Sequence, residues 1–526
     1  MNRRGLFQSL LGVSKEPNFD LPSQQGSTKI VDMSEKTSPL TRSEATHLLR
    51  RVTFGPTPEL VNQMTGKTPR EAVELLLGQD SVVPTTNPGP WVDIPNENPE
   101  GIGSAELKNQ IEGQMQGNYR LLVGWWIEQM RVETVPATEK ITLFWSGHFT
   151  SEFVFDEYFL PPQLLYRQNL LVRKDRLLDF KSFVEDITLD PAMLFYLGGV
   201  QNTKGKPNEN YARELLELYT CGLGNYTEGD IKEAARVLTG WRANGFLYEP
   251  FPNGYFKTFF FPQSHDTEAK QFMGETIPSR TPDSNNQEQV REQEVRKLIE
   301  ILFTNRANAI ARFISKKLYK FFVYSNGALS NENALTEMST TFIENNFIIR
   351  PLIVKLLTSN HFYSEEILGV QIKTPSEYLI GLQRYVGTPL SDTQSLMGQI
   401  NQELMDPPDV SGWPGYRTWI STATFPLRRS TADTYFRGLS DTVLNDFIRK
   451  FPDYTDVRVL AKDLISYFLP VPVSTTRELY YTEELLGTTI DFDYEWPTIL
   501  NNPSRTATGV RNLLISLSKA PDFQLS

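Results

Sequence analysis

The chain has four histidines, and histidine is the side chain that normally exchanges a proton near neutral pH. His148 lies in "SGHFTSE" and His265 in "QSHDTEAK", each beside small or polar residues at an expected helix break. Backbone N–H groups are free at helix ends, where side chains can meet a ligand. We therefore predict catalytic roles for His148 and His265. We expect His47, within an apolar helix, to be buried and structural, and His361 to lie at a helix end in a capping or dipole role.

Carboxylates near these histidines could complete two kinds of site. With Asp266, Glu209 or Glu214, the two histidines could bind a divalent metal ion, whose identity the sequence leaves open. Alternatively, a histidine oriented by a carboxylate could act as a general base. The sequence has no His-Glu-x-x-His pair, EF-hand loop, Gly-x-Ser-x-Gly elbow or P-loop. The third interpretation is a hydrogen-bonded polar core that joins helices.

The densest pattern in the chain is "PNENYARELLELYTCGLG", residues 207–224. Asn208 is placed to cap a helix, and Gly222 to end it. At about 100° per residue, such a helix has one apolar and one charged face. The predicted buried face consists of Tyr211, Ala212, Leu215, Leu216, Leu218 and Tyr219. The predicted solvent face consists of Glu209, Asn210, Arg213, Glu214 and Glu217.

This helix could also form one wall of a site. The preceding "GGVQNTKGKPNEN" concentrates small and amide residues, which is typical of a chain that closely approaches something else. A second helix over residues 228–240, capped by Thr227 and Asp230, should pack antiparallel to the first. The predicted ligand-binding residues are Asn208, Glu209, Asn210, Arg213, Trp241 and Asp266. We expect one cavity to be lined by His148, His265, Asn208, Glu209 and Glu214.

The stretch "DPPDVSGWPGYRTWISTAT", residues 406–424, joins two tryptophans with Arg417 and turn-forming prolines and glycines. Such a loop could form an aromatic platform for sugars or peptides. The alternative is rigid packing of proline against tryptophan.

The elements around these residues are mostly amphipathic helices, so the predicted fold is a large, mainly α-helical array. We expect a single domain over residues 41–526 and a disordered tail over residues 1–40. Within the domain, residues 82–104 form a Pro/Gly loop, and residues 245–290 form a polar and aromatic insertion with a small β-hairpin near 245–270. Ser43 is expected to cap the first helix, and Thr68, followed by Pro69, the second.

Composition narrows the functional classes. The 526 residues are 39% hydrophobic and 12% aromatic, so the chain can bury a large core. The formal net charge of -11 argues against a nucleic-acid partner. Cys221 is the only cysteine, which excludes an intrachain disulfide and a cysteine-based zinc site. We expect no membrane span, because no run of about 18 apolar residues is present.

The chain begins "MNRRGLFQSLLG", and the Arg3–Arg4 pair is similar to a twin-arginine export signal. The polar segment that follows lacks the apolar region of such a signal, which favours a flexible tail and a cytoplasmic protein. Export to the periplasm or cell envelope is the alternative.

Several stretches resemble a bacterial family catalogued as domain of unknown function 1800. They are "HLLRRVTFGPT", "FWSGHF", the long segment from "DPAMLFYLGG" to "EAARVLTGW", "HDTEAKQFMG" and "PPDVSGWPGYRTWISTAT". The likeness spans residues 41–526. It implies no settled activity, but members often carry a twin-arginine leader, and their genes commonly neighbour a sulfatase-like family.

Two functions are therefore predicted. The first is a non-catalytic interaction or assembly protein that works with a sulfatase-like partner, in keeping with the helical architecture and acidic charge. The second is a hydrolase of a polymeric or envelope substrate, acting through His148, His265 and acidic residues. Convergence of these side chains in one concave pocket would favour the hydrolase.

Overall fold

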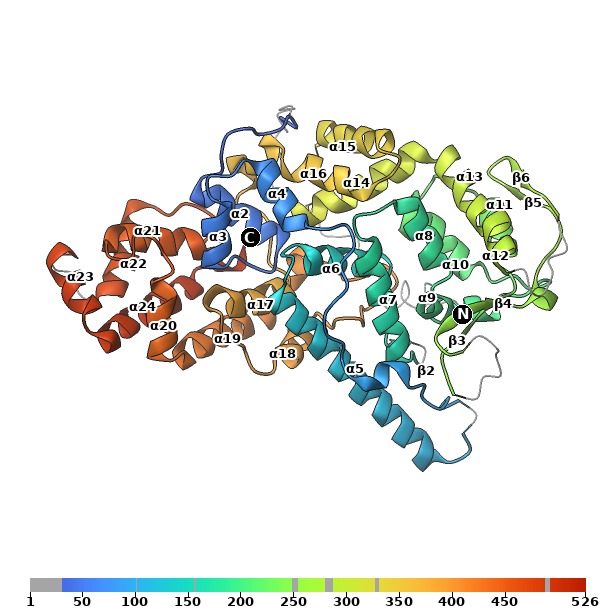
Figure 1. Ribbon diagram of the computed structural model, residues 1–526, viewed down its shortest axis with the longest axis horizontal. Helices are drawn as coiled ribbons and strands as arrows, with labels where there is room; N and C mark the ends of the chain where they lie inside the picture. The colour runs from blue at the N-terminus through green and yellow to red at the C-terminus, as the bar shows by residue number, and fades with distance from the viewer. Residues whose placement is uncertain are drawn as a thin grey trace. The chain divides into compact units, whose positions relative to one another are not determined.

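The computed structural model describes residues 31–100, 102–155, 158–247, 254–279, 287–326, 331–487 and 492–526 (Figure 1). The chain divides into two units, Met1–Val31 and Asp32–Ser526. The helices and strands of the described residues belong to the second unit. The prediction of a mainly α-helical fold is confirmed, with a few short antiparallel strand pairs. Among the described residues, no helix has the length and apolar character needed to cross a membrane.

Residues 32–40, which the sequence analysis assigned to the tail, lie against the body. Met33 and Leu40 are buried. Asp32 and Lys36 make backbone hydrogen bonds with the segment around residues 358–361. These two apolar side chains anchor the segment, since it has no helical periodicity of its own. The rest of the predicted tail, including Arg3 and Arg4, lies outside the described residues.

The first third of the unit is helical. Its helices are α2 (Arg42–Val52), α3 (Pro58–Met64), α4 (Pro69–Leu77), η1 (Pro90–Asp93), α5 (Ala105–Val132), α6 (Thr138–His148), α7 (Pro162–Asp175), α8 (Phe180–Thr188), α9 (Pro191–Tyr196) and η2 (Gly199–Gln201). The cap of α2 is Thr41, in a capping box with Glu44, so the prediction of Ser43 is wrong by two residues. Both candidates have a hydroxyl, but only Thr41 has a glutamate three residues later. Thr68 caps α4 as predicted.

The middle of the chain contains the helix pair and the strands. In order these are β1 (Val154–Phe155), β2 (Tyr158–Phe159), α10 (Glu209–Glu214), the π-helix η3 (Leu215–Thr220), α11 (Glu228–Val237), β3 (Trp241–Asn244), β4 (Lys257–Phe260), η4 (Pro262–Ser264), β5 (Lys270–Phe272) and β6 (Glu275–Ile277). β1 pairs with β2, β3 with β4 and β5 with β6, each antiparallel. The predicted hairpin therefore starts earlier, at Trp241, and residues 248–253 of its connection lie outside the described residues.

The last half is helical again. Its helices are α12 (Gln287–Val290), the π-helix η5 (Arg291–Arg296), α13 (Lys297–Asn305), α14 (Ala307–Phe322), α15 (Glu332–Glu344), α16 (Ile349–Leu357), η7 (Asn360–Tyr363), η8 (Glu365–Ile367), α17 (Pro375–Val386), α18 (Thr393–Gln399), η9 (Tyr416–Trp419), α19 (Thr424–Gly438), α20 (Asp441–Ile448), α21 (Val457–Phe468), α22 (Thr475–Leu486), α23 (Phe492–Leu500), α24 (Pro503–Lys519) and η10 (Pro521–Gln524). α24 packs against α19, α20 and α22, and α14 packs against α15.

Helix α6 lies at the centre of this arrangement and is buried along almost its whole length. A helix that is buried on every side needs partners for its charged residues. Glu139 of α6 pairs with Arg173 of α7, and Lys140 pairs with Glu377 of α17. These ion pairs fix α6 to its neighbours and determine where its last residue, His148, lies.

Candidate functional site

His148 lines a cavity of about 290 Å³ that lies among α6, α14, α17 and the loop over residues 411–419. The cavity has an aromatic wall and several basic and amide side chains. Its lining includes His148, Lys317, Lys320, Glu377, Gln402, Trp413 and Trp419.

The imidazole of His148 is held in one tautomer. Its Nε2 lies 3.0 Å from the carbonyl oxygen of Tyr219, which can only accept, so Nε2 carries the proton. Burial, and then the nearby Lys317, hold the pKa of His148 well below its usual range. The neutral ring therefore offers the lone pair of Nδ1, which accepts a hydrogen bond from Lys317 Nζ at 2.8 Å. His148 orients the lysine and is not placed to titrate near neutral pH.

Lys317 comes from the middle of α14 and is half-buried. Its Nζ donates to His148 Nδ1 and to the carbonyl oxygen of Leu218, at 3.1 Å. Burial, followed by the charge of Lys320, lowers the pKa of Lys317 to about 7. A neutral amine has two N–H groups, and both have acceptors here. Lys317 also lines the cavity, so an amine whose N–H groups are engaged in this way could act there as a general base or nucleophile through its lone pair.

The segment "PNENYARELLELYTCGLG", residues 207–224, contacts both of these side chains. The carbonyl groups of Leu218 and Tyr219 belong to the last turn of η3, where a helix has no internal donors for them. Lys317 and His148 supply those donors. The negative end of the helix therefore faces the amine and the imidazole.

This helix is phased differently from the prediction. Glu214 and Glu217, expected on the solvent face, are buried, and Leu218 is half-buried. The change from α-helix to π-helix at Leu215 accounts for Glu217 and Leu218, because a wider turn rotates every later side chain relative to a regular helix. Glu214 precedes this change and is buried within α10 itself. Glu217 accepts a hydrogen bond from Tyr226 at 2.7 Å. The predicted capping box of Thr227 and Asp230, and the packing of α10 against α11, are confirmed.

The loop over residues 411–419 closes the cavity. Gly412 has φ +89°, and a Cβ added there would lie 2.6 Å from the carbonyl oxygen of Gly147. The ring of Trp413 lies over Gly147, 3.5 Å from where a Cβ would be. Two glycines therefore let this loop lie directly on the end of α6, beside His148. The segments "FWSGHF" and "SGWPGYRTW" meet at one site, although they are over 250 positions apart.

A family model described as "Protein of unknown function (DUF1800)" matches residues 47–525. The chain belongs to the DUF1800 family. No curated protein and no solved structure matches it.

The structure of this DUF1800 chain separates the other predicted site residues. Asn208 caps α10 and lines a second cavity, together with Asn210. Arg213 lies nearer the surface and pairs with Glu228 at 2.8 Å and Glu209 at 3.6 Å. His148 and Asn208 were expected to line one cavity, but they line two different ones. The first turn of α10 lies at the cavity of Asn208, and the last turn of η3 lies at the cavity of His148.

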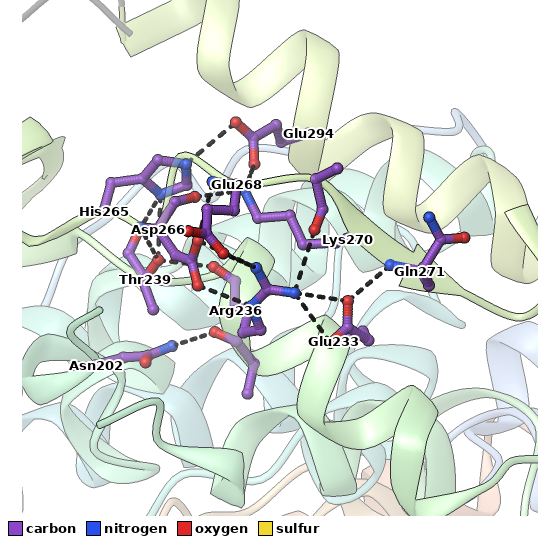
Figure 2. A network of polar contacts seen from close by, with 12 residues as sticks. Asn202, Glu233, Arg236, Thr239, His265, Asp266, Glu268, Lys270, Gln271 and Glu294 are labelled. Carbon is purple, nitrogen blue, oxygen red and sulfur yellow. Dashed lines mark hydrogen bonds and ion pairs between the residues drawn. The ribbon is translucent and has the colours of Figure 1, made fainter. Parts of the chain in front are cut away.

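His265 is 0% exposed and belongs to a polar network (Figure 2). Its Nδ1 donates to the carbonyl oxygen of Thr239 at 2.8 Å, and its Nε2 lies 3.1 Å from Glu294 Oε1. Lys270 Nζ contacts the other oxygen of Glu294 at 2.7 Å. Every polar atom of the imidazole thus has a partner, and the geometry is that of a polar core joining β5 to η5, the alternative recognised in the sequence.

Asp266 is a member of this network and accepts a hydrogen bond from Arg236 Nε at 2.7 Å (Figure 2). Trp241 is buried at the start of β3. Among the residues that the structure describes, no group of three or more His, Cys, Asp or Glu side chains could hold a metal ion.

Sequence analysis missed Lys317. The segment "NRANAIARFISKKLYKFFV" is a regular amphipathic helix, in which a lysine normally faces solvent. Only the tertiary placement of His148 and Leu218 around the amine distinguishes Lys317 from the neighbouring Lys316.

Proposed function

We propose that the cavity of His148 and Lys317 is the active site of a hydrolase, with Lys317 as the general base. The observation that supports this is the placement of the amine in the cavity wall, with acceptors on His148 and Leu218 for both of its N–H groups. A base with a pKa near the working pH is the most effective in proton transfer.

In the proposed reaction, Lys317 Nζ takes a proton from a water molecule as its oxygen forms a bond to the substrate. The bond to the leaving group breaks, and the proton passes from the ammonium to that group, which restores the neutral amine. The two acceptors of Lys317 keep the amine in place during both transfers. His148 is a positioning residue in this scheme, because its own ring stays neutral.

The charges around the base support an active site over a purely structural core. Burial alone would raise the pKa of Glu377, but Lys140 and the backbone N–H of Thr374 hold it below its ordinary value. The positive charge of Lys140 thus balances the negative charge of Glu377. Lys320 also lines the cavity, and its cation can stabilise the negative charge that develops on the attacked group.

The role with a sulfatase-like partner, implied by the family resemblance, stays a prediction. It would not by itself require a half-buried amine of lowered pKa beside a cavity. Placing an amine there has a cost in stability, and active sites are where such costs are concentrated.

The test uses a panel of chromogenic esters and glycosides with the wild type, Lys317→Met and Lys316→Met. Activity should rise with pH through about 7, as the base loses its proton. Lys317→Met should lower the rate by about 10²–10⁴-fold. Lys316→Met alters the exposed neighbour and should leave the rate unchanged. Equal rates in the two variants would contradict the assignment.

A substrate-independent test accompanies it. An amine-reactive ester at pH 7.5 should label Lys317 faster than Lys316, because the uncharged amine is the reacting species. Mass spectrometry of the labelled peptides measures the two rates. Faster labelling of Lys316 would show that the Lys317 amine is not available as a base.

A further inference from the structure

Three cavities adjoin one another within the unit of residues 32–526. The cavity of Lys317 shares Gln402 as a wall residue with a cavity of about 580 Å³ between α5 and the segment around α18. That second cavity shares Phe159 with a third, of about 430 Å³, at the start of α10. Each neighbouring pair therefore has a side chain in common, so the three are arranged in a row, with Lys317 at one end.

The middle cavity combines an aromatic wall with side-chain amides. Tyr119 and Phe153 stack with ring centroids 4.1 Å apart and an interplanar angle of 2°. Gln116, Gln394 and Gln399 line the same space. An amide offers two donors and an acceptor, which suits a ligand group that both donates and accepts.

The third cavity repeats this composition. Tyr158 and Phe195 provide aromatic surface, and the side chain of Tyr158 is 47% exposed. Asn98, Gln201 and Asn210 line it with amides. Two of the asparagines predicted to bind a ligand, Asn208 and Asn210, thus have a cavity in front of them.

Sugars match this chemistry. A sugar ring presents hydroxyl groups around its edge and C–H groups on its faces, which pair with amides and with aromatic rings. A nucleic acid is disfavoured because carboxylates line the middle cavity (Glu403 and Asp406) and the third cavity (Glu112). A peptide bound by strand addition would need a free strand edge for its main-chain hydrogen bonds, whereas the polar groups named in these walls are side-chain amides.

We propose that the three cavities are successive subsites for one linear, uncharged oligosaccharide chain, which they lead to Lys317. This inference rests on the proposed function for the identity of the reacting end. The binding of the chain in the middle and third cavities does not depend on the chemistry at Lys317.

The experiment measures binding of a neutral β-1,4-linked series, from disaccharide to hexasaccharide, by calorimetry with the full chain. The probes are glucose and N-acetylglucosamine oligomers, and an uncharged peptide of matched length is included. Affinity for one sugar series should increase at least tenfold with length, as more subsites are filled. Tyr158→Ala should weaken hexasaccharide binding about tenfold, the upper range of an aromatic contact.

Tyr480→Ala is the matched control, because Tyr480 is 48% exposed and lies on α22, away from the three cavities. It should leave the affinity unchanged. Absence of binding for both sugar series, affinity that does not change with length, equal effects of the two tyrosine variants, or preference for the peptide would each overturn the proposal. If length-dependent binding is found but Lys317→Met retains full hydrolysis, the proposed function alone is refuted.

Discussion

Replacing Lys317 by methionine should change how the free energy of unfolding depends on pH. Burial, and next the charge of Lys320, lower the pKa of the Lys317 ammonium from its ordinary 10.5 to about 7 in the folded chain. Between these values the unfolded chain binds a proton that the folded chain lacks. Wild-type stability should therefore rise with pH across this window. The cost in free energy of keeping the Lys317 ammonium charged in the folded chain is complete below about pH 7 and absent above 10.5.

The magnitude follows from the gap between 10.5 and about 7. Each pH unit of that gap corresponds to ~1.4 kcal/mol, which gives an upper limit of ~5 kcal/mol. Lys317 is half-buried, so water screens part of the effect, and we expect ~2 kcal/mol between pH 7 and 10. The lost hydrogen bonds to His148 and Leu218 shift the Lys317→Met curve without changing its slope.

The assay is denaturant unfolding of the wild type and Lys317→Met at intervals from pH 7 to pH 10. The difference in free energy of unfolding should move by ~2 kcal/mol in favour of the wild type as pH rises. Lys316→Met, altered at the exposed neighbour, should differ from the wild type by a constant amount. If the Lys317→Met and wild-type curves stay parallel, the fold does not hold the amine uncharged, and the reasoning for Lys317 as the base fails.

Three further predictions concern stability and can be checked by denaturant unfolding. Leu215→Ala, at a position that is 0% exposed, should lower the free energy of unfolding by ~2–5 kcal/mol, and a negligible change would mean that its surroundings collapse into the space. Gly412→Ala should destabilise more than Gly205→Ala, because both have positive φ but only Gly412 has backbone within 3 Å of an added Cβ; equal losses would show that strain alone matters. Glu294→Gln should cost ~3–5 kcal/mol, since it removes the buried carboxylate that His265 and Lys270 both contact, and a loss below ~1 kcal/mol would show that the network in Figure 2 is dispensable.

The sequence predicts the helices well where local signals agree. Thr68 with Pro69 and Thr227 with Asp230 are complete capping signals, and both caps form as predicted. At the first helix the complete signal is the capping box of Thr41 with Glu44, whereas Ser43 has no such partner, and the helix begins after Thr41. Local chemistry thus determines helix starts within a residue or two.

The candidate site is predicted only in part, because it depends on tertiary contacts. His148 is recognisable as a scarce histidine at a helix end, and it lines a cavity. His265 has the same local signature but meets Glu294 in a buried network. Lys317 has no local signature that separates it from other helical lysines, since its lowered pKa arises first from burial, which tertiary packing supplies, and only second from Lys320, three positions along the chain.

The π-helix η3 makes the site sensitive to chain length. A π-helical turn contains one residue more than an α-helical turn over the same rise, so it is equivalent to a single-residue insertion in a helix. Deleting one residue between Leu215 and Thr220 would restore a regular helix and rotate the following side chains by about 100°. The carbonyls of Leu218 and Tyr219 would then leave Lys317 and His148. A chain with that deletion could fold normally and still lose the base, which makes the length of this segment a criterion for which homologous sequences share the site.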